Sequence, residues 1–313
     1  MAKYEVIIIG GGPAGLTAGL YTSRAGLKSL LIERGIFGGQ MVNATLIENY
    51  PGFPQGIPGM ALGDLMRQQA VKYGLEVVAA EAKGVAHGQL HRVPTAEGDF
   101  EATAIIISAG SEYRKLGVAG EERLLGHGVS YCATCDGFLF RDQEVAVVGG
   151  GDTAITDALE LSRHAKKVYV IHRRDQLRAG QVLQHRAFAE PKLEFIWSTV
   201  IEEVLGDKAL EGVRLRNVMT DQHTILELAG VFVAVGLMPN SRSFFPILDL
   251  DDAGYIITDE TMATSSLGIF AAGDIRRNSP RQVSAAVGDG AIAAMSAFKY
   301  IQDHMNEARI TSP

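Results

Sequence analysis

The chain has 313 residues, long enough for two domains of ordinary size that each bury a core. Hydrophobic residues make up 47% of the sequence and charged residues 21%, values that exclude a disordered or fibrous protein. The formal net charge of −7 excludes a general attraction to nucleic acid or to an anionic membrane. No apolar stretch approaches the roughly 20 residues that span a bilayer.

The N-terminal segment, residues 1–9, contains an apolar run that could be mistaken for part of a signal peptide. The run is short and leads directly into Gly10-Gly11-Gly12-Pro13, without a small-residue cleavage pattern. We therefore expect a cytoplasmic protein.

Residues 5–34 predict a buried apolar strand, a glycine turn, an amphipathic helix and a second strand, which is how a doubly wound α/β domain begins. In such a turn Gly10 makes the tight bend, Gly12 lets the backbone approach a pyrophosphate, and Gly15 lets the helix pack close to the strand. The pyrophosphate then lies at the helix N-terminus, where free N–H groups favour an anion. The candidate cofactor contacts are Gly10, Gly12, Pro13, Ala14 and Gly15.

Glu33 closes the second strand of this unit. A carboxylate there can accept hydrogen bonds from both hydroxyls of an adenosine ribose, and it would repel a 2′-phosphate. The first site is therefore suited to FAD or NAD.

The only two cysteines of the chain, Cys132 and Cys135, form one CxxC and are followed by Asp136. In a reducing compartment such a pair suggests redox chemistry or half of a metal site. A structural zinc would need two further ligands, but there is no other cysteine and the eight histidines lack paired finger spacing, so we expect no metal. Asp136 is a candidate proton donor or acceptor for this pair, or a cap of the following turn.

Residues 144–173 repeat residues 5–34 without a gap and are identical to them at 12 of 30 positions. Gly149, Gly151 and Ala154 occupy the three glycine positions of the first copy, with Asp152 and Thr153 between them. A lone GxGxxG is weak evidence, but here each copy has a strand before it and a helix after it. The repeat therefore predicts a second dinucleotide site.

His172 stands at the position that aligns with Glu33, and three arginines follow it: Arg173, Arg174 and Arg178. Guanidinium groups bind phosphate through charge-assisted hydrogen bonds, so this site is suited to the 2′-phosphate of NADPH. A solvated basic loop is the alternative.

Eight short motifs resemble, in order and spacing, those of the low-molecular-weight thioredoxin reductases of bacteria, archaea and lower eukaryotes. They are GGGPAG (10–15), GGQM (38–41), ENYPGFP (48–54), CATCDG (132–137), GGGDTA (149–154), HRRDQLRA (172–179), VAVGLMPN (233–240) and IFAAGD (269–274). CATCDG ahead of the second glycine motif is the most specific of them.

The resemblance implies an α/β fold with two Rossmann-like domains of the three-layer ββα type, the NADPH domain being inserted into the FAD domain. The FAD domain would comprise residues 1–113 and 246–313, and the NADPH domain with its CxxC residues 114–245. A helix expected over 283–300 would point its N-terminus at the flavin, or simply cover the FAD domain. The further cofactor contacts implied are Gly39, Gln40, Asn49, Gly110, Gly236, Gly273, Asp274, Arg281 and Gln282.

The family mechanism implied by the resemblance carries electrons from NADPH through FAD and the disulfide to thioredoxin. Cys135 would face the flavin, Cys132 would attack the protein substrate, and Asp136 would be the general acid. The inserted domain would rotate between two states on hinges near 113–117 and 242–246. A homodimer is also expected.

Other functions remain open on the same fold. One is a small-molecule dithiol oxidase or the reductase of a peroxide-reducing system, although the latter usually carries extra N-terminal modules and this chain begins with its FAD strand. Another is a non-catalytic redox-sensing flavoprotein. The expected NADPH clamp of Arg173, Arg174 and Arg178, which is intact, argues against it. Larger disulfide reductases place their cysteine pair after the first glycine unit, where this chain has Gly38-Gly39-Gln40-Met41.

Overall fold

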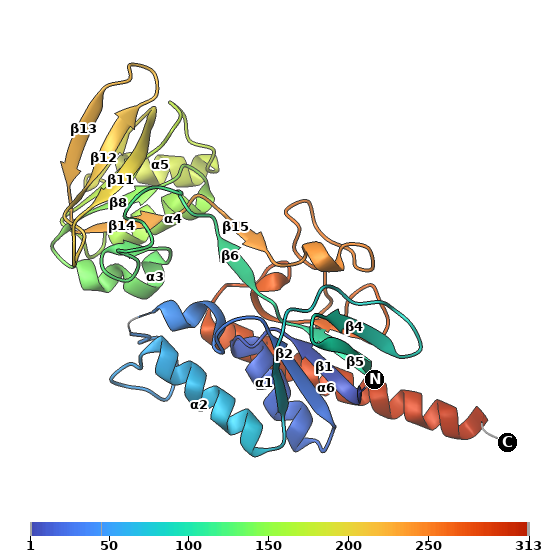
Figure 1. The fold of residues 1–313 in the computed structure, drawn as a ribbon. Helices are drawn as coiled ribbons and strands as arrows, with labels where there is room; N and C mark the ends of the chain where they lie inside the picture. The colour runs from blue at the N-terminus through green and yellow to red at the C-terminus, as the bar shows by residue number, and fades with distance from the viewer. Residues whose placement is uncertain (1, 45, 312–313) are drawn as a thin grey trace. The chain divides into compact units, whose positions relative to one another are not determined.

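The computed structural model describes residues 2–44 and 46–311. It contains two compact units: a discontinuous unit, Met1–Glu112 with Met238–Pro313, and an inserted unit, Tyr113–Leu237. Residues 238–245, which the sequence analysis places in the inserted domain, thus belong to the discontinuous unit. Figure 1 shows the inserted unit in green to golden and the discontinuous unit in blue to teal and orange to red.

The discontinuous unit is built on a six-stranded sheet in the order β16-β5-β1-β2-β3, with β4 paired to β5. All pairs are parallel except β4 with β5. The central strand is β1, whose residues Ile7 and Ile8 are completely buried, as expected for a parallel strand covered on both faces. The strands are β1 (Ala2–Ile9), β2 (Ser29–Glu33), β3 (Glu76–Ala79), β4 (His91–Thr95), β5 (Gly98–Ile107) and β16 (Ile269–Ala271).

Three helices cover one face of this sheet (Figure 1). They are α1 (Pro13–Arg24), α2 (Gly59–Lys72) and α6 (Val283–Thr311), and the short 3₁₀ turns are η1 (Gly39–Asn43), η3 (Arg242–Phe244) and η4 (Gly273–Ile275). Val6 and Ile8 of β1 pack against the helices, whereas Ile7 and Ile9 face the opposite side. The alternation of successive side chains along a strand thus divides the apolar residues between two cores.

The inserted unit has a five-stranded parallel sheet in the order β10-β9-β8-β14-β7. One face packs against helices and the other against an antiparallel sheet in the order β11-β12-β13, which makes three layers. The parallel strands are β7 (Val129–Ser130), β8 (Glu144–Val148), β9 (Lys167–Ile171), β10 (Leu193–Ile196) and β14 (Gly230–Val233). The remaining elements are β11 (Thr199–Leu205), β12 (Gly212–Asn217), β13 (His223–Glu227), α3 (Ala133–Asp136), α4 (Asp152–Leu161), α5 (Gln181–Ala189) and η2 (Gly137–Phe140). A separate two-stranded ribbon, β6 (Ser111–Tyr113) with β15 (Leu237–Pro239), forms where the chain passes between the units.

Both parallel sheets have the same strand order around their glycine turns. The central strand, β1 or β8, pairs on one side with the strand that follows its helix and on the other with a strand from much later in the chain. Ligands bind at such a switch point, beyond the carboxyl ends of the strands. The predicted fold class and the repeated strand, turn, helix and strand are confirmed.

Candidate active site

The first glycine turn, between β1 and α1, is tightly packed behind and open in front. Gly10 has φ +106°, and a Cβ there would lie 2.4 Å from the carbonyl oxygen of Ser108. A Cβ on Gly15 would lie 1.8 Å from the carbonyl oxygen of Gly10, so only glycine fits. At Gly12, by contrast, the nearest atom to such a Cβ is 3.9 Å away, which leaves room for a ligand to approach the backbone.

The N-terminus of α1 follows this turn. Pro13 and Ala14 form its first turn, and no side chain caps it. Its first N–H groups are thus available to an anion, which fits the diphosphate of a dinucleotide.

Glu33 lies beside the same turn, at the end of β2. Its carboxylate accepts hydrogen bonds from the backbone N–H of Gly11 (2.5 Å) and of Gly35 (2.7 Å). These two donors hold the carboxylate at the ribose position of the fold, where a 2′-phosphate would be repelled.

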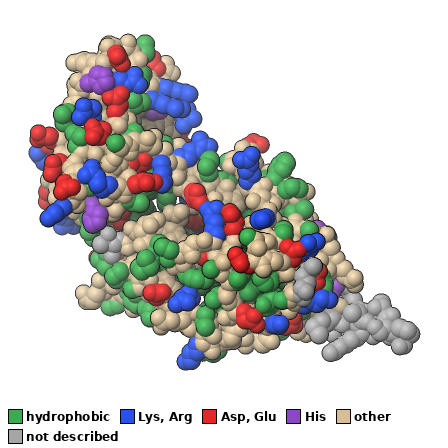
Figure 2. Space-filling view, in the orientation of Figure 1, with side chains coloured by type: hydrophobic (Ala, Val, Ile, Leu, Met, Phe, Trp, Pro, Cys, Tyr) green, Lys and Arg blue, Asp and Glu red, His purple; other side chains and the backbone are tan. Residues whose placement is uncertain are grey.

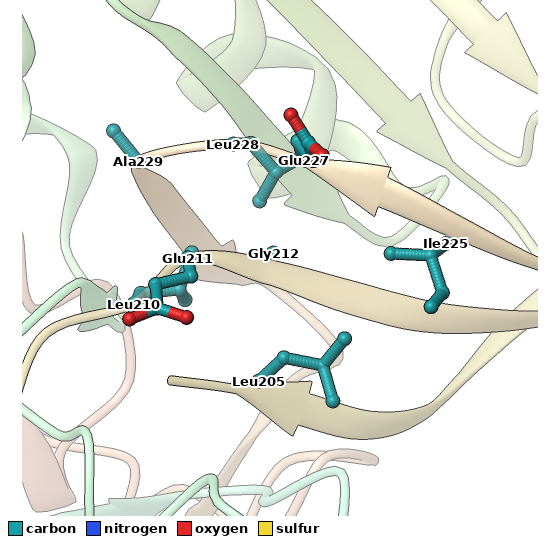
Figure 3. A pocket seen from close by; sticks show the side chains of 8 residues that line it. All are labelled: Leu205, Leu210, Glu211, Gly212, Ile225, Glu227, Leu228 and Ala229. Atoms are coloured by element: carbon teal, nitrogen blue, oxygen red, sulfur yellow. The ribbon is translucent and has the colours of Figure 1, made fainter. Parts of the chain in front are cut away.

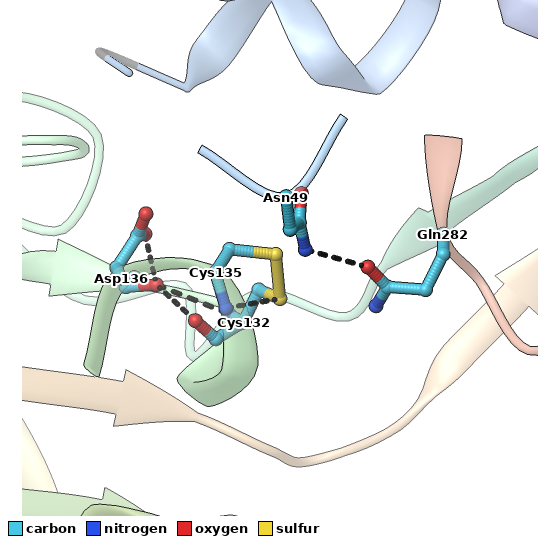
Figure 4. Close-up of a disulfide and its surroundings, with 6 residues drawn as sticks. Asn49, Cys132, Cys135, Asp136 and Gln282 are labelled. Carbon is cyan, nitrogen blue, oxygen red and sulfur yellow. Dashed lines mark hydrogen bonds between the residues drawn. A yellow bond between two sulfur atoms is a disulfide. The ribbon is translucent and has the colours of Figure 1, made fainter. Parts of the chain in front are cut away.

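Segments distant in sequence meet this first site. A Cβ on Gly39 would lie 3.1 Å from Cα of Gly12, and one on Gly273 would lie 3.0 Å from Cβ of Ala14. The Asn49 amide donates to Oε1 of Gln282 at 3.0 Å (Figure 4). The structure therefore brings Gly39 and Gly273 to the glycine turn and joins Asn49 to Gln282.

Gln40 and Gly110 make fewer contacts than the other predicted residues of this site. Gln40 is exposed, and its Oε1 accepts a long hydrogen bond of 3.4 Å from Asn43. Gly110 has φ +64° and open space where a Cβ would stand. Neither residue makes a contact that identifies a ligand.

Asp274 lies in η4, and burial raises the pKa of its carboxyl, while the hydroxyl of Ser279, which donates at 2.8 Å, opposes that rise. The adjacent Gly273 N–H donates to Asp289, a buried residue of α6. Asp289 also accepts two hydrogen bonds from the guanidinium of Arg276, at 2.5 and 2.8 Å. Sequence reasoning missed this ion pair, because an aspartate inside a helical pattern carries no signal of a distant partner.

The last helix begins at Val283, as expected, and the carbonyl of Gln282 accepts from the N–H of Ala286 in its first turn. Arg281 therefore lies just before the helix. Its backbone is left-handed, with φ +58°. The guanidinium lies over the ring of Tyr255 and donates to its hydroxyl at 3.2 Å. Tyr255 was not predicted as a neighbour.

The second glycine turn joins β8 to α4 in the inserted unit. Gly149 has φ +150°, and Ala154, completely buried, fills the third position. Nothing lies within 4 Å of the place where a Cβ on Gly151 would stand, so this turn is also open. Asp152 accepts from the N–H of Gly180 at 2.7 Å, and Thr153 is exposed.

His172, just after β9, is buried beneath this turn. A Cβ on Gly150 would lie 2.4 Å from its ring, and only 5% of the residue is exposed. Burial lowers the pKa of His172 and the charges of the neighbouring arginines act in the same direction, while a backbone hydrogen bond at Gln176 opposes them. Its Nε2 has no hydrogen-bond partner among the described residues. The lowered pKa disfavours a charged imidazole, so the exposed arginines supply the positive charge beside this turn.

The side chains of Arg173, Arg174 and Arg178 are exposed. In residues 2–44 and 46–311 none of the three forms an ion pair with a carboxylate. The N–H of Arg178 donates to the carbonyl of Gly150 at 2.6 Å, which attaches the arginine loop to the glycine turn. These cations fit an additional phosphate on a bound nucleotide. Gly236 has φ +119°, its carbonyl accepts from the N–H of Arg114 at 2.9 Å, and a Cβ there would lie 3.6 Å from Cδ of Arg114.

Cys132 and Cys135 are joined in a disulfide, with Cα atoms 5.3 Å apart (Figure 4). Both cysteines are half-buried. Cys132 is the N-cap of α3, and Cys135 lies within it. The N–H of Cys135 donates to Sγ of Cys132 at 3.2 Å. A hydrogen bond of this kind stabilises a thiolate on Cys132 after reduction, which makes that sulfur the better nucleophile.

Asp136 lies beside the disulfide and is linked to it through Ser130. The Ser130 hydroxyl donates to the Asp136 carboxylate at 2.6 Å and accepts from the N–H of Cys132 at 3.0 Å. Burial raises the pKa of Asp136, and the hydrogen bond from Ser130 works against it. Ser130 was not predicted, because a serine at the end of a short strand carries no functional motif.

Glu121 is a second residue that the motifs missed. It is 1% exposed, and its carboxylate accepts from the N–H groups of Leu116 and Gly117, both at 2.8 Å. It also accepts from the hydroxyl of Tyr131 at 2.7 Å, and Tyr131 directly precedes Cys132. The loop 116–121 is thereby tied to the redox turn.

A hollow of about 490 Å³ in the inserted unit lies away from all predicted site residues (Figure 3). It is formed where β11 ends, β12 begins and β13 ends, by Leu205, Leu210, Glu211, Gly212, Ile225, Glu227, Leu228 and Ala229.

Within the described ranges, no cluster of three His, Cys, Asp or Glu side chains is arranged to bind a metal ion. Across the same ranges, no helix combines the length and apolarity required of a membrane span.

The site combines three features: an open turn that favours an unmodified ribose, another that favours a phosphorylated one, and a disulfide beside a protonatable carboxyl. Together they suit electron transfer between a nucleotide and sulfur. Comparison with known proteins agrees. Residues 4–290 match the pyridine nucleotide-disulphide oxidoreductase family. The chain is 50% identical to a thioredoxin reductase of Listeria monocytogenes, over 96% of this chain and 94% of that protein.

Two further relatives cover nearly all of the chain. The crystal structure of a thioredoxin reductase from Streptococcus pyogenes superposes with a TM-score of 0.93 at 46% identity, over 96% of this chain and 99% of that one. A bifunctional thioredoxin reductase/thioredoxin of Mycobacterium leprae is 44% identical over 96% of this chain and 66% of that protein. The chain therefore belongs to the pyridine nucleotide-disulphide oxidoreductase family, and within it to the low-molecular-weight thioredoxin reductases.

Proposed function

We propose that this enzyme passes two electrons from NADPH, through FAD, to the Cys132–Cys135 disulfide and from there to the disulfide of a thioredoxin. The observation that carries the proposal is a single disulfide in a chain with two open dinucleotide turns of opposite preference. One turn ends in the carboxylate of Glu33, and the other in three arginines that form no ion pair with the carboxylates the structure describes.

The discontinuous unit would hold FAD. Backbone N–H groups after Gly12 would bind the diphosphate, and Glu33 would accept from the ribose hydroxyls. Gly39, Asp274 and the Asn49–Gln282 pair would line the rest of the site. Bound FAD supplies the chemistry that joins hydride transfer to disulfide reduction.

The inserted unit would hold NADPH at the turn Gly149–Gly151. Asp152 fixes the loop that follows the arginines through its bond to Gly180. Arg173, Arg174 and Arg178 would bind the 2′-phosphate through charge-assisted hydrogen bonds. The site would therefore favour NADPH over NADH.

The thiol chemistry follows from the hydrogen bonds at the disulfide. Reduction breaks the S–S bond with two electrons and leaves a thiolate on Cys132, stabilised by the N–H of Cys135. That thiolate attacks the substrate disulfide, forms a mixed disulfide and releases one substrate sulfur. Cys135 then attacks Sγ of Cys132, which re-forms the internal disulfide and releases the second substrate sulfur.

Asp136 would handle the protons of this exchange. Because burial raises its pKa, the carboxyl holds a proton closer to neutral pH than an exposed aspartate does. It can therefore protonate a leaving thiolate and later take the proton from Cys135.

The choice of thioredoxin as substrate rests on the relatives, one of which is fused to a thioredoxin. We also propose that the inserted unit rotates, since NADPH and the disulfide belong to one unit and use the same FAD. The first hinge stays near 113–117, but the second is better placed at β15 (Leu237–Pro239) than at the expected 242–246, because those residues belong to the discontinuous unit, where Phe244 is buried. A cytoplasmic location suits a disulfide that must be reduced repeatedly.

A homodimer is supported by apolar side chains exposed on the helices of the discontinuous unit. Large exposed examples are Tyr21 on α1, Met60, Leu65 and Val71 on α2, and Ile292, Met295 and Phe298 on α6. Figure 2 shows apolar side chains gathered over this unit, whereas charges of both signs are interspersed over the inserted one. Sedimentation equilibrium tests the proposal, and a monomer at micromolar concentration would reject it.

The decisive experiment is anaerobic addition of NADPH to the yellow holoenzyme, followed by oxidised thioredoxin with insulin reduction as readout. We expect rapid bleaching of the flavin and NADPH-dependent insulin reduction. Cys135→Ser should keep the bleaching and lose the insulin reduction, because the internal disulfide cannot form. Bleaching without transfer to thioredoxin in the unaltered enzyme would favour a dithiol oxidase, and absence of bleaching would favour a redox sensor.

A further inference from the structure

An aromatic stack lies beside the candidate NADPH site, and no motif accounts for it. The ring of Trp197 stacks on Phe195, with centroids 5.1 Å apart and an angle of 7° between the planes. The ring of His172 meets it edge to face at 6.5 Å and 73°. Trp197 is half-buried. It is therefore the aromatic neighbour of the imidazole that lies beneath the second glycine turn.

The backbone around Trp197 is also bound to the arginine segment. The N–H of His172 donates to the carbonyl of Ile196 at 3.0 Å, and the N–H of Thr199 donates back to the carbonyl of His172 at 3.0 Å. The N–H of Ser198 donates to the carbonyl of Arg174 at 3.1 Å. The turn 197–199 therefore holds the backbone of the clamp at both His172 and Arg174.

This turn adopts an unfavourable backbone conformation. Ser198 has φ +51°, a left-handed value that is uncommon for a residue other than glycine. It is kept there by the bond to Arg174 and by the N–H of Val218, which donates to the Ser198 carbonyl at 2.6 Å. The Thr199 hydroxyl donates to the carbonyl of Trp197 at 2.7 Å. Such conformations persist where surrounding contacts determine them, often next to functional sites.

We infer that Trp197 and the turn 197–199 are positioning residues for nucleotide selectivity. Trp197 holds His172 under Gly150, and the turn holds Arg174 where a 2′-phosphate would arrive. The inference deepens the proposed function, because it rests on the arginine clamp being an NADPH site. Its readout is selectivity for the extra phosphate, which a purely structural role in the fold would leave unchanged.

The test uses the FAD-loaded enzyme and two probes that differ by one phosphate, 2′,5′-ADP and 5′-AMP, measured by calorimetry. Trp197→Ala should weaken binding of 2′,5′-ADP roughly tenfold, as for the loss of one hydrogen bond to a charged group. Binding of 5′-AMP should change little. Trp197→Phe, which keeps a ring edge toward His172, should bind both probes as the unaltered enzyme does. In steady state, Trp197→Ala should raise the KM for NADPH with kcat unchanged.

A matched control is Phe188→Leu. Phe188 belongs to the same aromatic group, with its ring 4.9 Å from Phe195 and 6.5 Å from Trp197, but it is exposed, and among the described rings it is Trp197 that contacts His172. It should leave both affinities unchanged. If Trp197→Ala does not fold, Ser198→Val and Ser198→Gly test the turn, since glycine adopts the left-handed backbone without strain and a β-branched residue does not. Valine should weaken 2′,5′-ADP binding and glycine should preserve it.

The outcomes separate this inference from the proposed function. If the unaltered enzyme binds 2′,5′-ADP no better than 5′-AMP, the arginine clamp itself is wrong. If the unaltered enzyme discriminates and Trp197→Ala discriminates equally well, the clamp stands and the role of Trp197 is overturned. Since the chain has a single tryptophan, a change of its emission on adding 2′,5′-ADP is a second readout that reports on this residue alone.

Discussion

Removal of the Ser130 hydroxyl should change the proton chemistry at the disulfide without touching a cysteine. Ser130 is buried, and its hydroxyl, at 2.6 Å, opposes the rise that burial causes in the pKa of Asp136. A hydrogen bond to a charged group contributes about 1.5–3 kcal/mol. One pKa unit corresponds to about 1.4 kcal/mol. Ser130→Ala should therefore raise the pKa of Asp136 further, by about one to two units.

The assay is the pH dependence of single-turnover transfer from the reduced enzyme to thioredoxin. If Asp136 is the general acid, the rate falls where Asp136 ionises, and Ser130→Ala should move that limb about one to two units toward alkaline pH. Asp136→Asn should lack the limb altogether. Ser130→Thr keeps the hydroxyl and serves as the control that should restore the original profile.

Two results would refute this reasoning. An unchanged limb in Ser130→Ala would show that the hydrogen bond does not control the acid, and a limb that persists in Asp136→Asn would assign it to another group. The N–H of Cys132 also loses its acceptor in Ser130→Ala, so the variant should unfold at slightly lower denaturant concentration. That loss is measured separately and does not shift a pH limb.

Three further predictions concern stability and cofactor binding. Burial, with a smaller contribution from His87, lowers the pKa of the buried His91 from 6.5 to about 4. Between these two pH values the unfolded chain binds a proton at His91 that the folded protein does not. About 3 kcal/mol of stability present above pH 6.5 should therefore be lost as the pH falls to 4. Thermal melts across this range should show the loss in the unaltered protein and a flatter profile in His91→Leu, whereas parallel profiles would contradict it. Gly15→Ala should abolish FAD retention, because its Cβ would stand 1.8 Å from the carbonyl oxygen of Gly10; a yellow protein with normal flavin content would count against the packed turn. Arg173→Ala with Arg174→Ala should raise the KM for NADPH far more than that for NADH, and equal effects on both would reject the clamp.

The main chemical elements of the site could be predicted from short stretches of sequence. Each glycine turn lies between an apolar strand and an amphipathic helix, so the period of the pattern and the turn residues suffice to place it. The residue after the second strand and the CxxC are equally local, and the two cysteines had no other partner in the chain. The motif order then pointed to the family, as the comparisons confirm.

Only the tertiary structure decided which polar groups meet. Asn49 and Gln282 are 233 residues apart, and neither belongs to a periodic pattern that would pair them. The same holds for Arg276 with Asp289, whose contact depends on how α6 packs against the segment before it. His172 aligns with Glu33 in sequence, yet its ring is buried under Gly150, whereas the Glu33 carboxylate accepts hydrogen bonds from the N–H groups of Gly11 and Gly35. Local sequence thus specifies strands, turns and their chemical type, whereas the partners of buried polar groups depend on long-range packing that no short pattern encodes.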